Sequence, residues 1–203
     1  ANKVRQDALT LNSLLAGAGA ASVATPFPGT AIGQQLLQVA KVIKLRPSTG
    51  IARQVFFCSL DGFDTHSGQS WQQMDLLRQV GDAMAAFYNA TVELGVAGNV
   101  TTFSESDFGR TLQPSGSGTD HGWGNHQLVM GGAVRGGNVY GNFPFPALGG
   151  PDDAGARGAL IPSTSLDQFG ATLARWFGVG AAQMATVFPS LGAVATADLG
   201  FLT

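Results

Sequence analysis

The chain has 203 residues, with 13 acidic and 11 basic side chains and a formal net charge of −2. A charge this close to neutral leaves no basic surface and argues against nucleic acid as the main partner. Charged residues make up only 12% of the chain, against about 25% in an ordinary soluble domain, so polar chemistry is expected to gather at a few positions. No stretch reaches the ~18 apolar residues that a membrane-spanning helix needs, and no transmembrane segment is predicted.

The length favours one domain over residues 1–203. Its first part, residues 1–29, is predicted to be a peripheral helix over residues 3–16 followed by a loop rich in Gly, Ala and Pro. A second helix is predicted from Thr30, a suitable N-cap, to Leu45, because apolar residues recur between them at helical spacing.

Residues 55–60 are predicted to form a strand that is buried on both faces. The segment opens with an unbroken apolar run of β-branched and aromatic residues, which is too short for a helix of its own. Cys58, the only cysteine of the chain, lies in this run and is expected to pack in the core.

A long amphipathic pattern over residues 68–94 predicts the next helix, and the run 100–103 predicts a second strand. Strand, helix and strand are predicted to form a βαβ unit, whose two strands are expected to pair in parallel. The helix is expected to pack its apolar stripe against the sheet. This stripe consists of Trp71, Met74, Leu77, Val80, Met84, Phe87, Thr91 and Leu94.

Further along, residues 127–130 are predicted to form a short strand. A capping box of Ser165 and Gln168 predicts the start of the last clear helix, and Gly178 is expected to end it. Its predicted buried face consists of Leu166, Phe169, Leu173, Trp176 and Phe177.

Polar side chains follow both predicted strands. Asp64 and His66 come after the first strand, two residues apart, so an extended chain directs both to one side. Asp107 comes after the second strand, and a Gly-rich loop then leads to Asp120 and His121. Because ligands gather beyond the carboxyl ends of parallel strands, these five side chains are expected to converge.

Carboxylate and imidazole groups together suit zinc, manganese or iron better than calcium. Two metal ions about 3.5–4 Å apart need roughly this number of ligands, so a divalent metal site is predicted. His126 is either a third imidazole ligand or a group behind the ligands. The alternative is that these Asp and His side chains only form hydrogen bonds and turns in their loops.

Each of two further side chains has two possible roles. Arg110 is either a clamp for a phosphate or sulfate anion, or the partner of a salt bridge that orients Asp107 or Asp120. Asp61 either ligates the metal or caps a turn at Gly62.

Six segments together resemble the family of exported bacterial proteins called domain of unknown function 1501, which is placed in the alkaline phosphatase and sulfatase superfamily. The resemblance extends from about residue 30 to the C-terminus. Members more often have Glu where Asp107 stands, and they often have Gly where Asp61 stands. The segments are GFDTH (62–66), SDFGRT (106–111), GTDHGWG (118–124), GGAVRGGNVYG (131–141), IPSTSLDQFGATLARWFG (161–178) and VFPSL (187–191).

The resemblance implies an α/β fold with a mostly parallel, doubly wound sheet, flanking helices and a metal centre at the carboxyl edge of the sheet. In the wider superfamily such a centre hydrolyses phosphate or sulfate monoesters with a metal-activated nucleophile. A small anionic ester is the implied substrate, and the implied location is periplasmic or secreted. By position, Asp64 and His66 resemble one ligand pair, and Asp107, Asp120 and His121 resemble the remaining ligands.

The chain departs from this family at its start. Members look longer, and they begin with a twin-arginine signal and a first strand that ends in Asn-Asp-Gly, neither of which has a counterpart here. We therefore expect a fold that is incomplete at the N-terminus, with the missing N-terminal part of the same protein as a partner, and we assign no nucleophile. One hypothesis is an exported metal-dependent hydrolase of phosphate or sulfate esters. The other is a non-catalytic exported binding or assembly protein with a structural metal or none.

Overall fold

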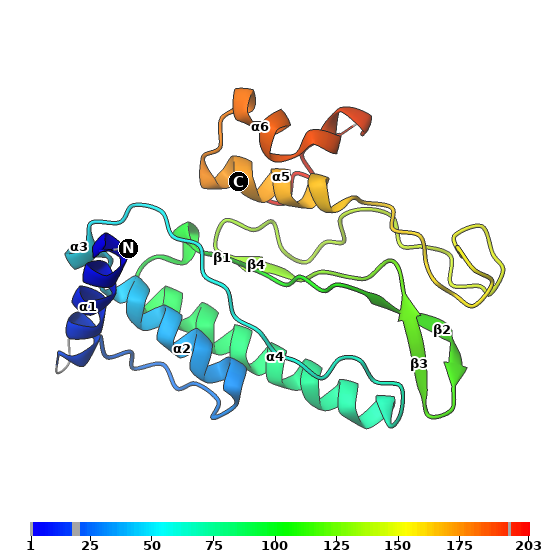
Figure 1. Cartoon of the computed structure of the whole chain (residues 1–203), viewed down its shortest axis with the longest axis horizontal. Helices are drawn as coiled ribbons and strands as arrows, with labels where there is room; N and C mark the ends of the chain where they lie inside the picture. The colour runs from blue at the N-terminus through cyan, green and yellow to red at the C-terminus, as the bar shows by residue number, and fades with distance from the viewer. Residues whose placement is uncertain (1, 18–20, 195) are drawn as a thin grey trace. The chain divides into compact units, whose positions relative to one another are not determined.

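The computed structural model describes residues 2–17, 21–194 and 196–203. The chain forms two compact units, one of residues 1–62 and 74–100 and one of residues 63–73 and 101–203. Figure 1 labels the elements of both units along the chain. None of the helices in the described ranges combines the length and the apolar character needed to cross a membrane. The single domain over residues 1–203 stays a prediction.

The first unit is helical. It contains α1 (Asn2–Ala16), α2 (Ala31–Lys44), α3 (Arg46–Thr49), the 3-10 helix η1 (Ala97–Asn99) and most of α4 (Gln69–Glu93). The long helices α1, α2 and α4 confirm the three helices predicted for this part of the chain. Thr30 caps α2 as predicted, because its side chain accepts a hydrogen bond from the main-chain N–H of Gly33.

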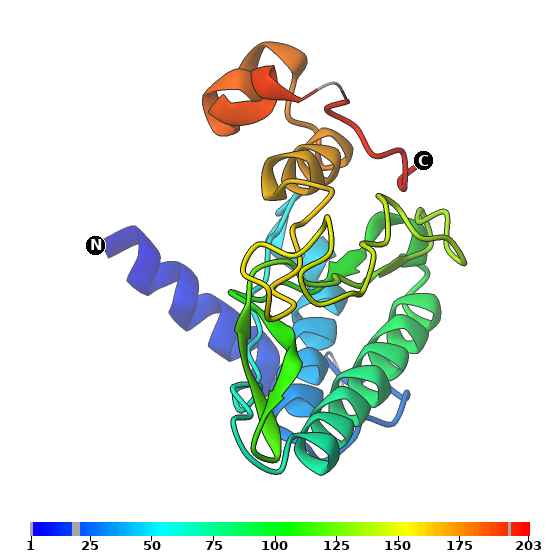
Figure 2. The same ribbon diagram turned by 90° about the vertical axis from the view of Figure 1, so that its right-hand side faces the viewer.

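The core of this unit lies between α2 and α4, which run side by side in Figures 1 and 2. Each helix turns the apolar face predicted by its residue spacing into this contact. Cys58 packs half-buried against the same cluster, as predicted, and burial raises the pKa of its thiol. The buried residues are Ile32, Leu36, Val39, Ala40, Ile43, Ala83, Phe87, Ala90 and Val96.

The apolar stripe of α4 is buried only in its second half. Phe87 and Thr91 are buried as predicted, but Trp71, Met74 and Leu77 are 63%, 68% and 56% exposed. The stripe was predicted to pack against a sheet, but its buried second half packs against α2 in the core of this unit. Its first half is exposed because α4 has 25 residues and its packing partner α2 has only 14.

Glu93, at the end of α4, holds the loop that precedes α2. Its carboxylate accepts hydrogen bonds from the main-chain N–H groups of Ala24 (2.9 Å) and Thr25 (2.8 Å) and from the hydroxyl of Thr25 (2.6 Å). These bonds, that of Ala24 first, hold the pKa of Glu93 below its ordinary value. The ionised form of Glu93 therefore stabilises the folded state.

We expect this stabilisation to be lost in acid. Because the folded pKa is lowered, the contribution is complete above the ordinary glutamate pKa of about 4.3 and disappears as the pH falls through the lower pKa of the folded state. Thermal melts across this range should show a smaller acid-induced drop in Tm for Glu93→Gln than for the parent chain. Asp82→Asn, which changes another exposed carboxylate of α4, should leave the drop unchanged. An equal drop in Glu93→Gln and the parent would contradict the role of Glu93.

The second unit contains two small antiparallel sheets. In the first sheet, β1 (Thr101–Phe103) pairs with β4 (Val129–Gly131). In the second, β2 (Gly109–Ser115) pairs with β3 (Gly118–Gly122). The C-terminal part adds α5 (Leu166–Phe177), α6 (Ala181–Val187) and the 3-10 helix η2 (Pro189–Ala193).

Three aromatic rings pack together in the second unit. Phe169 of α5 packs edge-on against Phe103 of β1, with ring centroids 5.8 Å apart, and lies 5.7 Å from the ring of Phe201. The predicted capping box and the terminal Gly178 of α5 are both confirmed. Phe169 is buried as predicted, whereas Leu166 in the first turn of α5 is 68% exposed.

The fold mixes helices and sheets, but the mostly parallel, doubly wound sheet predicted from the sequence is wrong for the described residues. Residues 55–60 form no strand, and β1 pairs with β4 in antiparallel, with Thr102 opposite Met130. The segment 55–60 has the composition of a strand, but a strand also needs a neighbour to bond with. Here the main chain of Ser59 bonds to the side chain of Gln35 instead.

Candidate metal centre

The hairpin of β2 and β3 carries one half of the candidate site. Gly116 and Ser117 form its two-residue turn, in which Gly116 has a φ of 65°, a left-handed conformation that favours glycine. The register places Arg110 of β2 directly opposite His121 of β3, so both side chains lie on one face of the hairpin. Figure 2 shows the two strands as a twisted ribbon.

The loop over residues 63–68 lies against this hairpin and carries the other half. The main-chain N–H groups of Gly68 and Gln69 donate to the hydroxyl (2.9 Å) and the carbonyl oxygen (3.0 Å) of Ser117. Within the loop, Thr65 is 2% exposed, and its hydroxyl accepts a hydrogen bond of 3.0 Å from the side-chain amide of Gln73. These bonds hold the loop beside the hairpin turn.

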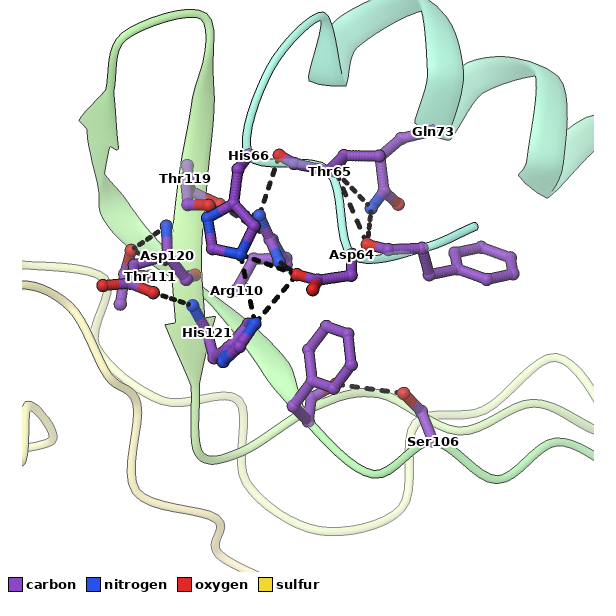
Figure 3. A network of polar contacts seen from close by, with 12 residues as sticks. Asp64, Thr65, His66, Gln73, Ser106, Arg110, Thr111, Thr119, Asp120 and His121 are labelled. Carbon is purple, nitrogen blue, oxygen red and sulfur yellow. Dashed lines mark hydrogen bonds and ion pairs between the residues drawn. The ribbon is translucent and has the colours of Figure 1, made fainter. Parts of the chain in front are cut away.

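Asp64, His66 and His121 meet at one point, as Figure 3 shows. Oδ1 of Asp64 lies 2.9 Å from Nε2 of His66 and 2.8 Å from Nε2 of His121. The two Nε2 atoms lie 3.2 Å apart. Between 51% and 53% of each side chain is exposed, so the cluster is open to solvent.

Hydrogen bonds alone cannot satisfy Oδ1 of Asp64 and the two Nε2 atoms at the same time. If both Nε2 atoms carry protons and donate to Asp64, the two N–H groups also face each other; if one is unprotonated, its lone pair faces the carboxylate oxygen. A cation removes the conflict, because both imidazoles can then turn lone pairs toward it. Tetrahedral zinc with bonds of about 2.0–2.2 Å separates its ligand atoms by about 3.3 Å. The donor atoms of the cluster lie 2.8, 2.9 and 3.2 Å apart, so small outward shifts would give them the spacing that a zinc ion needs.

The surroundings of Asp64 keep it ionised. Burial alone would raise the pKa of its carboxyl group, but the hydrogen bonds to Arg110 and His121 and the electrostatic effect of the two imidazoles bring that pKa below its ordinary value. The ionised carboxylate is the form that binds a metal ion.

Arg110 joins the loop to the hairpin. Its guanidinium donates to Oδ1 of Asp64 (3.0 Å), to the carbonyl of Thr65 (2.8 Å), and to both the hydroxyl (3.0 Å) and the carbonyl of Thr119. Four contacts leave too few of its N–H groups for a bidentate anion clamp, and only 15% of the side chain is exposed. The geometry favours the salt-bridge interpretation, with Asp64 as the partner.

The other predicted ligands lie outside this cluster. Asp120 turns its carboxylate to the main-chain N–H of His121 (2.9 Å), a hydrogen bond that lowers the pKa of Asp120. Asp107 is exposed and does not belong to the cluster. His126 stacks on Phe143, with ring centroids 5.1 Å apart.

Sequence reasoning missed the residues that support the cluster. Gln73 anchors the loop, and Arg157 lies 3.5 Å from the carboxylate of Asp120; no local pattern marks either residue. The sequence does contain a pattern that predicts the hairpin, because Gly116-Ser117 is a two-residue sequence typical of a tight hairpin turn.

A family model described as "Protein of unknown function (DUF1501)" matches residues 47–156. The match covers more than half of the chain, and it includes the loop and the hairpin that form the cluster. No curated protein and no solved structure matches the chain. The protein that carries this cluster of one carboxylate and two imidazoles therefore belongs to the DUF1501 family of proteins of unknown function.

Proposed function

We propose that this protein is an exported metal-dependent hydrolase of phosphate or sulfate esters, with Asp64, His66 and His121 as metal ligands. One observation carries the proposal: a carboxylate oxygen and two imidazole Nε2 atoms converge from two segments that are far apart in the sequence. Two imidazoles and a carboxylate are the ligands of many catalytic zinc sites, which keep a further position open. The same set suits iron(II), and manganese is the third candidate.

The charge of the cluster supports an anionic substrate. Arg110 balances the carboxylate of Asp64 at 3.0 Å, so a divalent cation would leave an excess of positive charge that attracts phosphate or sulfate. Bound there, the metal would supply Lewis-acid stabilisation of the ester oxygens and would activate a nucleophile. Arg110 keeps the Asp64 carboxylate in place, and Gln73 anchors the loop through Thr65.

The reaction class rests on the motif resemblance to the alkaline phosphatase and sulfatase superfamily. A centre of that type needs more ligands than this cluster holds, together with a nucleophile. We propose that the N-terminal part of a longer polypeptide supplies these groups, with Asp107, Asp120 and His126 as candidate ligands of a second ion. Export to the periplasm or the cell exterior belongs to the same proposal.

Metal analysis and two assays test the proposal. The chain, and the longest natural chain that contains it, are stripped with a chelator, reloaded with zinc, manganese or iron(II), and assayed with p-nitrophenyl phosphate and p-nitrophenyl sulfate. We expect stoichiometric metal, and turnover of one ester that the chelator abolishes and the metal restores.

The second candidate function is a non-catalytic exported binding or assembly protein with a structural metal or none. It is favoured by one observation, namely that no Ser or Thr hydroxyl in the described ranges forms a hydrogen bond with a side chain of the cluster. Stoichiometric metal without turnover in the longest chain would support this candidate. A chain that takes up no metal, and whose Tm is unchanged by the chelator, would exclude both metal roles.

A further inference from the structure

The segment 51–60 is mostly apolar, and several of its large apolar side chains are exposed. Phe57 is 89% exposed, Val55 78% and Ile51 51%. The composition of this run is that of a strand buried on both faces, and the structure leaves much of it in solvent. Exposed apolar surface of this kind is typical of an interaction site.

Exposure alternates over the last four residues of the run, while Val55 and Phe56 before them are both exposed. Cys58 and Leu60 pack against the helical core of the first unit, whereas Phe57 and Ser59 are exposed. A period of two indicates an extended backbone. Figure 1 shows the segment after α3 as a drawn-out coil.

One edge of this extended backbone is occupied, and the other is not. The N–H and C=O of Ser59 bond to the side-chain amide of Gln35, at 3.0 Å and 2.9 Å. Successive residues of an extended chain point their main-chain groups to opposite edges, so those of Phe56, Cys58 and Leu60 point away from Gln35. Within the described ranges these groups have no hydrogen-bond partner. An edge of this kind can accept another strand.

We propose that a second copy of this chain pairs with this edge, in antiparallel and in a register centred on Phe57. Arg53 and Asp61 are the only charged residues between positions 50 and 63, and both are exposed. They lie at equal distances in sequence on either side of Phe57. In this register Arg53 of each copy lies opposite Asp61 of the partner, and a register centred on Phe56 or Cys58 loses both ion pairs.

The same register uses the free edge. Phe56 exchanges main-chain hydrogen bonds with Cys58 of the partner, and the two Phe57 residues form a close pair with Cα atoms about 4.5 Å apart. Their exposed rings then cover each other, which is favourable for aromatic pairs across strands. The interface is closed by its two-fold symmetry, so the edge recruits one partner and no more.

Cysteine cross-linking tests the register. In a Cys58→Ala background, the variants Phe57→Cys and Val55→Cys each carry a single thiol, and both are oxidised with diamide. Phe57→Cys should give a covalent dimer on a non-reducing gel. Val55→Cys is the matched control and should stay monomeric, because the two copies of residue 55 are about 13 Å apart in this register. Equal cross-linking of the two variants, or none in either, would overturn the proposal.

Exchanging the charges of Arg53 and Asp61 tests whether a second copy of the chain occupies the edge. Light scattering over a concentration series should give a dimer for the parent chain and a dissociation constant about tenfold higher for Arg53→Glu. The double variant Arg53→Glu/Asp61→Arg should restore the parent value, and unchanged circular dichroism would show that each variant is folded. The proposal is overturned by a monomer at every concentration, by open-ended aggregates, or by a longer natural chain in which a monomer protects Phe57→Cys from oxidation.

Discussion

Asp64→Asn is expected to abolish metal binding and to leave the fold intact. The change keeps the size of the side chain but removes the only carboxylate of the cluster and its charge. Loss of one ligand from a three-ligand site should weaken zinc binding by more than about 100-fold. The free energy of unfolding should change little, because half of the Asp64 side chain is exposed and solvent screens its ion pairs.

Asp61→Asn is the matched control for this variant. It makes the same chemical change three residues earlier, at an exposed carboxylate outside the cluster. Calorimetric titration of both variants with zinc and manganese, after treatment with a chelator, measures the difference. If Asp64→Asn bound metal as tightly as Asp61→Asn, the cluster would not be a metal site and the hydrolase proposal would lose its support.

Two members of the cluster could be predicted from the sequence. Asp64 and His66 are two residues apart in a chain with few charges, and a spacing of two is enough to place them on one side. Sequence spacing could not show which of Asp120 and His121 joins the cluster. These two residues are neighbours on β3, and neighbours on a strand point to opposite faces. Only the hairpin register shows that His121 is the one on the face of Arg110.

The helices were predictable because their signals are local. Apolar spacing located α2 and α4, and the capping box of Ser165 and Gln168 located the start of α5. The parallel sheet was not predictable, because strand pairing joins segments that are distant in the chain. Residues 55–60 have a strand-like composition, yet it was β4 that paired with β1.

The candidate centre depends on how closely the loop over residues 63–68 approaches the hairpin. Gly118 begins β3 and lies directly beneath the main chain of that loop. A side chain on Gly118 would occupy the space of the loop itself. Glycine is therefore needed at this position because of the close approach of the loop, and not because of its backbone conformation.

Gly118→Ala is therefore expected to disrupt the centre without changing any ligand. The added methyl group would lie less than 3.0 Å from the carbonyl oxygen of Thr65 and from the carbonyl group of His66, which are main-chain atoms that cannot rotate away. Either the loop or the hairpin must move, which should lower the free energy of unfolding by about 1–3 kcal/mol. The same movement separates His66 from His121, so zinc affinity should fall at least about tenfold.

Gly136→Ala is the control, because a methyl group there meets no heavy atom within 4 Å. Melting curves with and without zinc separate the two effects of Gly118→Ala. The Tm of the metal-free protein reports the steric strain, and the rise in Tm on adding zinc reports the affinity of the folded state. The parent and Gly136→Ala should show the full rise, whereas Gly118→Ala should show little of it. A full rise in Gly118→Ala would mean that the three ligands bind zinc without the close approach of loop and hairpin, and the cluster would then need a different structural basis.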